Sequence, residues 1–199
     1  AEAFRYAVSI TSANWSGHTL KFGNGVSTDA SVNTNGFEFD TYYSSGELLL
    51  GNLIVDAGSG TNRWVSTSQY SGDGPDVGGN VTINSGSEIR NITGGAGMLV
   101  GGNIVNNGLL TTNVAIYFGS LSGTTFIPST NAQSISGSGI LRNATSGSTG
   151  SVVIFELYNS NPAGLTLNVP FTITGTTYLD QGPLNINGNT LSINGAITY

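Results

Sequence analysis

The stretch LTLNVPFTITGTTYLDQGPLNINGNTLSING, residues 165–195, decides the fold. Its apolar residues alternate with Thr, Asn and Ser in runs of about four residues. A period of two predicts β-strands whose side chains point in turn to the two faces of a sheet. Leu165 and Leu167 are therefore expected to point inward, and Thr166 and Asn168 outward. The expected strands are 165–168, 171–174, 176–179, 184–187, 191–194 and 196–199.

These strands repeat after nineteen to twenty residues, in the pairs Leu165/Leu184, Phe171/Leu191 and Thr177/Ile197. Such a repeat predicts an all-β fold, a right-handed parallel β-helix (β-solenoid) with three short strands per coil of about twenty residues. Short coils need corner residues that turn easily, and Asn side chains at equivalent corners can hydrogen-bond along the axis, as we expect for Asn168 and Asn187. The expected corner residues are Gly164, Gly175, Gly182, Gly188, Gly195, Pro170 and Pro183. A hairpin meander or a β-sandwich is the alternative, but it calls for longer strands with a turn every 8–12 residues.

Upstream, the pair Gly-Asn precedes an apolar strand at 51–56, 79–84 and 102–107, and again at 188–194. The uneven spacing of these copies indicates an inserted loop near 67–79, which is rich in turn residues. The apolar run 151–158 is expected to form two buried strands around a corner. Residues 1–199 are expected to form a single elongated domain, with regular coils over 51–199.

Residues 1–50 differ from the rest because they hold about half of the aromatic residues of the chain. We expect an N-terminal cap that merges into the first coils, since an exposed sheet edge is normally covered. These aromatic residues are Phe4, Tyr6, Trp15, Phe22, Phe37, Phe39, Tyr42 and Tyr43.

The C-terminal run AITY, residues 196–199, is expected to leave a strand edge open. An open edge can pair with another chain, so we expect head-to-tail self-association into a filament. The expected edge is Ala196, Ile197, Thr198 and Tyr199, with Phe4 and Tyr6 on the complementary end. In the alternative, the chain is a fragment of a longer repeat protein, and neighbouring repeats cover the edge.

Composition excludes several functions. The chain is 38% hydrophobic but only 8% charged, with a net charge of -6 and five cationic residues that occur singly. Nucleic acids and anionic membranes attract clustered basic residues, and no basic cluster occurs. No apolar run reaches the length of a membrane span, so membrane insertion is not expected. Because cysteine is absent, there is no disulfide framework.

Candidate chemistry is sparse, and we expect no catalytic residue, cofactor or metal. Glu38 and Asp40 would lie on one face of a strand at a separation compatible with a glycosidase pair, but we interpret them as a solvated strand face beside inward Phe37 and Phe39. Asp73 and Asp76 in SGDGPD allow a calcium loop or an ordinary Asp-Gly turn. His18 is the only histidine, and a surface position explains it. Asn-x-Ser/Thr sequons occur at Asn14, Asn80, Asn91 and Asn143.

The segments GNLIVDAGSG, GNVTINSGSEI, ISGSGILRN and GPLNINGNTLSINGAI resemble repeats of secreted bacterial surface proteins, the adhesins and autotransporter-like passengers. The resemblance covers about residues 50–199. It implies a secreted, extracellular or cell-surface protein with a structural or adhesive role and no enzymatic activity.

A carbohydrate-binding surface module is an alternative function. Its stacking residues would be Tyr42, Tyr43, Trp64 and Tyr70. Two further alternatives are an ice-binding solenoid and a polysaccharide-active enzyme. Ice binding needs outward Thr in register, whereas Thr166, Thr172 and Thr174 are followed one coil later by Asn185, Ser192 and Asn194.

Overall fold

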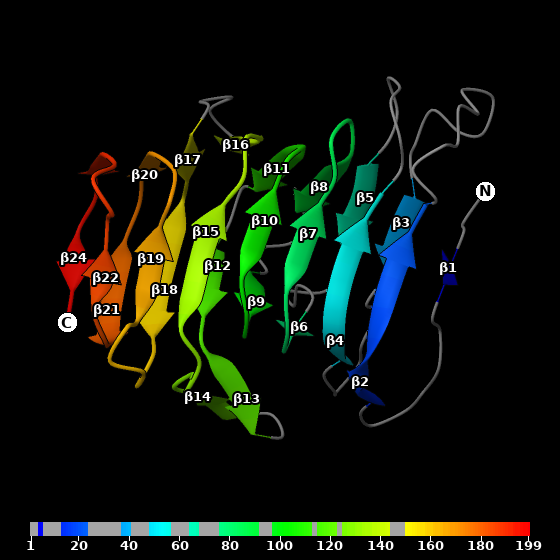
Figure 1. Cartoon of the computed structure of the whole chain (residues 1–199), viewed down its shortest axis with the longest axis horizontal. Helices are drawn as coiled ribbons and strands as arrows, with labels where there is room; N and C mark the ends of the chain where they lie inside the picture. Colours follow the sequence, from blue (N-terminus) through cyan, green and yellow to red (C-terminus); the bar gives the residue numbers. More distant parts are fainter. Residues whose placement is uncertain are drawn as a thin grey trace.

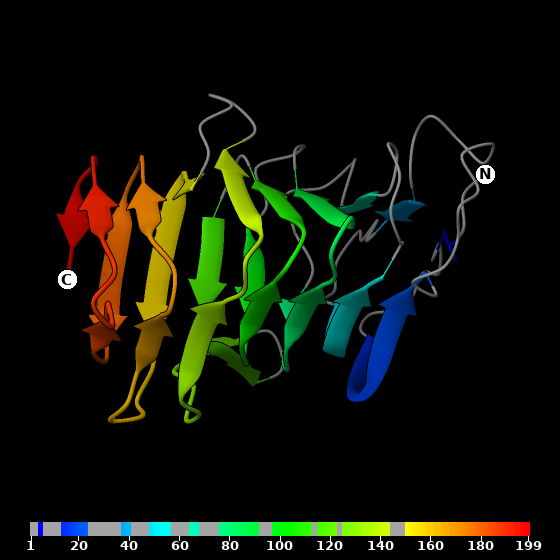
Figure 2. The same ribbon diagram turned by 45° about the horizontal axis from the view of Figure 1, so that its top comes forward.

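The computed structural model describes residues 4–5, 13–23, 37–40, 48–56, 64–67, 76–91, 97–112, 115–122, 125–143 and 150–199. In these ranges every regular element is a β-strand, and all strand pairs except one hairpin are parallel. The strands stack side by side along the longest axis (Figure 1), and the sheets curl around a common interior (Figure 2). The prediction of an all-β, parallel, solenoid-like fold is confirmed.

Three parallel sheets make up the wall. The first runs β1 (Phe4–Arg5), β3 (Phe37–Asp40), β5 (Trp64–Thr67), β8 (Glu88–Asn91), β11 (Leu109–Thr112) and β16 (Ile140–Asn143). The second and largest runs β22 (Leu184–Asn185), β19 (Leu165–Leu167), β15 (Gln133–Ser136), β10 (Ile104–Asn106), β7 (Val81–Ile83), β4 (Leu48–Val55), β6 (Asp76–Val77), β9 (Met98–Val100), β12 (Ala115–Phe118), β18 (Ile154–Tyr158), β21 (Thr177–Gln181) and β24 (Ile197–Thr198), with β2 (Ala13–Phe22) beside β4. The third runs β17 (Ser151–Val152), β20 (Phe171–Ile173) and β23 (Leu191–Ile193).

The largest sheet bends within β4. Leu49 and Leu50 pair with β6, whereas Leu53 and the residues after it pair with β7. Gly51 and Asn52 lie between these two halves, so one strand serves two sides of the wall. The bend brings the inward faces of both halves onto one apolar interior.

The predicted register of the C-terminal strands is confirmed. Leu165 pairs with Leu184, Phe171 with Leu191, and Thr177 with Ile197. Leu165 and Leu167 are buried and Asn168 is exposed, as the alternation requires. The run 151–158 also forms two strands, β17 and β18, as expected.

Inward side chains from the different sheets fill a common interior. Phe118 in β12, Phe155 in β18 and Phe171 in β20 are fully buried and out of register with one another, and their ring centroids lie 5.9 Å (Phe118–Phe155) and 5.7 Å (Phe155–Phe171) apart. Burial of each such ring stabilises the fold by about 1.5–3 kcal/mol. Branched aliphatic side chains stack in inward columns across neighbouring strands. Val55 is in register with Ile83, and Val81 with Ile104, and all four are fully buried.

The first three Gly-Asn copies meet at one corner, which we call the asparagine ladder (Asn52, Asn80 and Asn103). The Oδ1 of Asn52 accepts from the N–H of Asn80 at 2.9 Å, and the Oδ1 of Asn80 accepts from the N–H of Asn103 at 2.8 Å. The fourth copy precedes strand β23, as expected, but does not continue this ladder. Ser134 follows Asn103 instead, whereas the strand after Asn189 pairs with β20 in a different sheet.

The predicted coil length of about twenty residues holds at the C-terminal end and in some pairs of the middle, such as Glu88 with Leu109, but not throughout. Asn187 donates to Asn168 across nineteen residues, but Asn80 and Asn52 are 28 apart and Ser134 and Asn103 are 31 apart. One cause is a hairpin of β13 (Ser120–Ser122) and β14 (Thr125–Ile127), which the sequence did not reveal. In the predicted insertion at 67–79, Asp76 and Val77 belong to strand β6, and 68–75 lie outside the described residues.

The described parts of residues 1–50 belong to the parallel sheets. β1 pairs with β3, β3 with β5, and β2 with β4. The remainder of the predicted cap lies outside the described residues.

Candidate functional site

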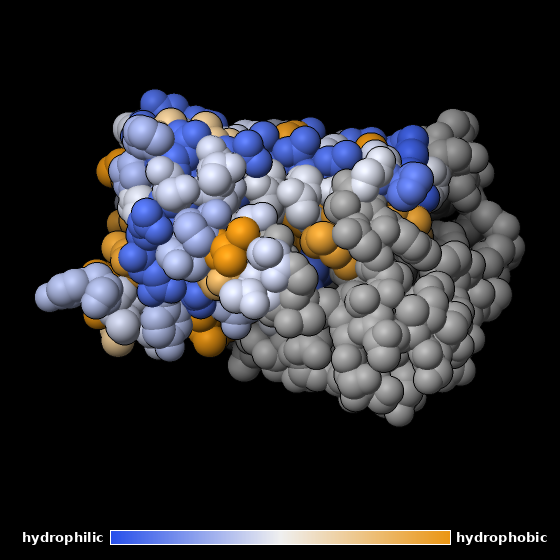
Figure 3. Space-filling model, turned by 90° about the horizontal axis from the view of Figure 1, so that it is seen from below, coloured by the Kyte–Doolittle hydropathy of each residue, from blue (hydrophilic) through white to orange (hydrophobic). Residues whose placement is uncertain are grey.

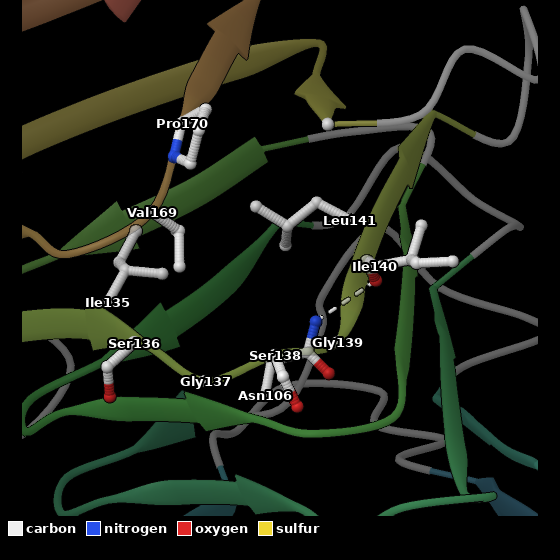
Figure 4. A pocket seen from close by; sticks show the side chains of 11 residues that line it. Asn106, Ile135, Ser136, Gly137, Ser138, Gly139, Ile140, Leu141, Val169 and Pro170 are labelled. Carbon is white, nitrogen blue, oxygen red and sulfur yellow. Dashed lines mark hydrogen bonds between the residues drawn. The ribbon is translucent and has the colours of Figure 1, made fainter. Parts of the chain in front are cut away.

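A cavity of about 320 Å³ opens at the corner between β15 and β16 (Figure 4). Ile135, Leu141 and Val169 form its apolar side, and residues 137–139 form its rim. The side-chain nitrogen of Asn106 donates to the carbonyl oxygen of Ile140 at 3.0 Å, which closes one wall. Because its described lining contains no titratable side chain, this cavity offers no acid–base chemistry.

A second place is the outward side of β12, β18 and β21, which we call the aromatic row. Tyr117, Glu156 and Tyr178 occupy the same register position on these three adjacent strands. Their neighbours Phe118, Leu157 and Leu179 point to the interior. Because adjacent residues of a strand point to opposite faces, the side chains of Tyr117, Glu156 and Tyr178 point outward. The aromatic row is completed by Phe126, Tyr158 and Asp180.

Asp180 reaches the row through an irregularity in β21. Leu157 pairs with Leu179, but the next residue, Tyr158, pairs with Gln181, so Asp180 is an extra residue. A bulge of this kind re-aims a side chain. The side chain of Asp180 is hydrogen-bonded to that of Glu156.

The electrostatics of the row follow from this contact. Partial burial, the negative charge of Asp180 and the hydrogen bond between them together raise the pKa of Glu156 to about 7. Burial, followed by the nearby Glu156 and Tyr178, raises the pKa of Tyr117. Two carboxyl groups in contact cannot both ionise easily, so one proton is shared near neutral pH.

A third place is the C-terminal end, formed by β22, β23 and β24. Each of these strands is the last of its sheet among the described strands. Leu184, Leu191 and Ile193 occupy inward columns but are only partly buried, and Ile197 is 51% exposed. Apolar residues are visible at this end of the molecule, on the left of Figure 3.

The predicted self-assembly residues differ in whether the structure describes them and in where it places them. Ala196, Ile197, Thr198 and Tyr199 are all exposed at the C-terminal end, and Tyr199 is 99% exposed. Phe4 lies in β1 in register with Phe39, while Tyr6 is outside the described residues.

Of the predicted glycan-stacking residues, Trp64 lies in β5 in register with Glu88. Tyr42, Tyr43 and Tyr70 lie outside the described residues.

Other candidate residues are placed as follows. Glu38 and Asp40 lie in β3, as the strand prediction required, and His18 is exposed in β2. Asp76 lies in β6, whereas Asp73 is outside the described residues.

Two of the sequons have defined side-chain roles. Asn80 belongs to the asparagine ladder, and Asn143 is buried with its amide donating to the Thr174 hydroxyl at 3.2 Å. Asn14 and Asn91 lie in β2 and β8. Across the described ranges, no three His, Cys, Asp or Glu residues are grouped so that they could hold a metal ion. Nor is any helix there long and apolar enough to cross a membrane.

The aromatic row was not predicted from the sequence. Its signal lies in the three runs AIYF, IFELY and TYLDQ, each of which places a Tyr or Glu between two inward residues. The hairpin β13–β14 and the longer corners separate these runs unevenly, so their alignment was hidden.

Comparison with known proteins identifies no relative. No protein-family model matches the chain, and neither a curated protein nor a solved structure matches it.

Proposed function

We propose that the chain is one elongated domain, a right-handed parallel β-helix with three strands per coil, and that it serves as a non-enzymatic structural module of a secreted or cell-surface protein. In this proposal the C-terminal end adds a further coil from a second copy of the chain, head to tail. The resemblance of its repeats to bacterial surface proteins supports the location. The observation that carries the assembly is the exposure of apolar residues at the ends of the inward columns.

The inward columns support the proposal because they stop before they are covered. In the middle of the molecule the residues of these columns are fully buried, as Phe155 and Leu165 are. At the C-terminal end Ile197 and Ile186 are 51% and 41% exposed. Another coil would bury this apolar surface, at about 25 cal/mol per Å² removed from water.

Backbone direction supports a second copy as the occupant. The N–H of Thr177 donates to the carbonyl of Ala196, and the N–H of Asn194 donates to the carbonyl of Ile173. In a parallel pair, alternate residues direct their backbone groups to opposite sides, so those of Ile193 and Ile197 face the open end. At the other end, β1 and β2 each pair with one described strand only. Two ends of parallel sheets are complementary head to tail, and such a contact does not close on itself.

The low charge of the chain also favours stacking. Only 8% of its residues are charged, so copies repel each other weakly despite the net charge of -6. A charge placed in an inward column of the end would oppose stacking, because its burial would be uncompensated.

Sedimentation velocity from micromolar to millimolar concentration tests the assembly, with electron microscopy of the largest species. The variant Ile197→Asp is expected to remain monomeric. Thr198→Asp is the matched control, because Thr198 is in register with the wall residue Tyr178 and its side chain lies on the outside. A wild-type chain that stays monomeric throughout, or equal assembly of both variants, overturns the proposal.

A further inference from the structure

The aromatic row carries a second inference, independent of the assembly. Two of its rings lie over glycines. A Cβ on Gly97 would collide with the ring of Tyr117, and a Cβ on Gly119 would collide with the ring of Phe126. Each ring therefore lies directly against the backbone of the wall, and both side chains are partly exposed.

The rings also hold one another in place. Phe126, from the inserted hairpin, meets Tyr117 edge to face with centroids 6.3 Å apart, and it meets Tyr158 at 5.5 Å. Such contacts contribute about 0.5–1.5 kcal/mol each beyond their buried area. The hairpin thus fixes an aromatic surface beside the carboxyl pair of Glu156 and Asp180.

The groups that face Glu156 are all acidic or neutral. Tyr117 comes from β12, Tyr178 and Asp180 come from β21, and Tyr158 lies on the same strand. Among the described cations, Lys21 is paired with Asp56 at 2.6 Å and Arg90 with Glu88 at 2.9 Å, both on other parts of the wall. With a shared proton, the carboxyl pair can both donate and accept hydrogen bonds.

We propose that the aromatic row binds a neutral polysaccharide chain that lies across β12, β18 and β21. The C–H face of a sugar ring packs on an aromatic ring, and its hydroxyl groups need partners that donate and accept, which the Glu156–Asp180 pair supplies. Tyr117 and Tyr178 stand two strand spacings apart, about 10 Å, a distance that linked sugar rings span.

Charge and ring geometry favour a neutral ligand. An acidic polysaccharide would be repelled by the carboxyl pair. An organic cation is best held between several ring faces, whereas Phe126 packs directly on the rings of Tyr117 and Tyr158, with centroids 6.3 and 5.5 Å apart.

Isothermal titration calorimetry with cellohexaose, xylohexaose and chitohexaose tests the proposal on the full chain. At least one of these neutral oligosaccharides is expected to bind, and Tyr178→Ala is expected to lower its association constant about tenfold, equivalent to about 1.4 kcal/mol. Tyr178→Phe keeps the ring and is expected to retain binding within about threefold. Tyr199→Ala, an exposed tyrosine outside the row, is the matched control and should bind like the wild type.

The carboxyl pair predicts a dependence on pH that a purely structural role would not give. Above its raised pKa, Glu156 is ionised and no longer supplies a donor. Binding is therefore expected to be weaker at about pH 9 than at about pH 5, and Glu156→Gln should remove most of this difference.

Three results would overturn the inference: no heat with any of the three oligosaccharides, wild-type affinity in Tyr178→Ala, or a preference for the cationic chitosan hexamer. The last result would assign the row to amines instead. Sedimentation of the same variants separates the two proposals, because Tyr178→Ala should leave assembly unchanged and Ile197→Asp should leave oligosaccharide binding unchanged.

Discussion

The side-chain amide of Asn159 donates to Oε1 of Gln133 at 2.7 Å, inside the corner where β18 ends. Asn159 is fully buried and also donates to the carbonyl of Asn131, while its Oδ1 accepts from the N–H of Asn161. The Nε2 of Gln133 in turn donates to the carbonyl of Val100 at 2.9 Å. Both this corner and the asparagine ladder are polar. Asn159 and Gln133 are buried, however, whereas Asn80 of the ladder is exposed.

Replacing Asn159 is expected to be costly, because its partners would remain buried without it. Asn159→Ala should lower the free energy of unfolding by about 2–3 kcal/mol, as measured by urea denaturation. Asn161→Ala removes an amide that donates to the Thr130 carbonyl at the more exposed side of the same corner, and it should cost about 1 kcal/mol or less. Equal losses in the two variants would contradict this account of the corner.

Replacing two buried threonines by valine is expected to change the unfolding free energy in opposite directions. The Oγ1 of Thr177 is buried and has no hydrogen-bond partner among the described residues, so Thr177→Val should raise the unfolding free energy by about 1 kcal/mol. Thr111 donates to Glu88 at 2.7 Å, and Glu88 also pairs with Arg90. Thr111→Val should therefore lower the unfolding free energy by about 1–3 kcal/mol. Thermal denaturation of both variants checks the contrast, and a loss in both would show that the Thr177 hydroxyl has a stabilising partner.

The carboxyl pair of the aromatic row should also affect stability. The pKa of Glu156 is about 7 in the folded chain, above the ordinary value of 4.5. Between these two values the folded chain binds more protons than the unfolded chain, so stability falls as pH rises through this window. Solvent screening of this half-buried group reduces the effect to about 1–2 kcal/mol.

Denaturant midpoints between about pH 4 and about pH 8 measure this change. Glu156→Gln, which cannot ionise, should flatten the decline, and Asp180→Asn should reduce it by removing the like charge. Glu88→Gln serves as a comparison on another face of the wall. A wild-type midpoint that rises across the window would refute the shared proton.

Close approach of neighbouring coils at the glycine corners gives a further prediction. A Cβ on Gly101 would collide with the backbone carbonyl of Gly78, which cannot move without breaking the corner. Gly101→Ala should destabilise the chain by about 1–3 kcal/mol. A Cβ on Gly17 meets no atom within 4 Å, so Gly17→Ala should change stability by about 0.5 kcal/mol or less. Circular dichroism melts of the two variants decide the matter.

The C-terminal coils could be predicted from sequence because one physical rule governs them. Inward and outward residues alternate within each strand from β19 to β23, and coils of nineteen to twenty residues align like with like. Upstream the alternation holds in strands such as β7 and β10 but not in β9, where all three residues are buried. The register between strands also depends on corner length, which burial does not constrain. Ile104 pairs with Ile135 across the hairpin β13–β14, and no periodicity could place that pairing.

The aromatic row escaped prediction for the same reason. Tyr117, Glu156 and Tyr178 meet only because three corners of different length return the chain to one register position. Their residue types were visible in the sequence, but their alignment was not. The bulge that turns Asp180 toward Glu156 is likewise a property of the paired strands.

The side-by-side stacking of parallel strands has a mechanical consequence. β1 and β24 lie at opposite ends of the molecule (Figure 1), and the hydrogen bonds between strands run along the line that joins them. A pulling force on the two ends would therefore stretch these bonds lengthwise and open the outermost coil first, so that rupture proceeds as peeling rather than shearing. Single-molecule extension should show a series of low, evenly repeated force peaks with a longer release of chain where the hairpin β13–β14 unravels, whereas a single high peak would mean that the whole molecule yields at once.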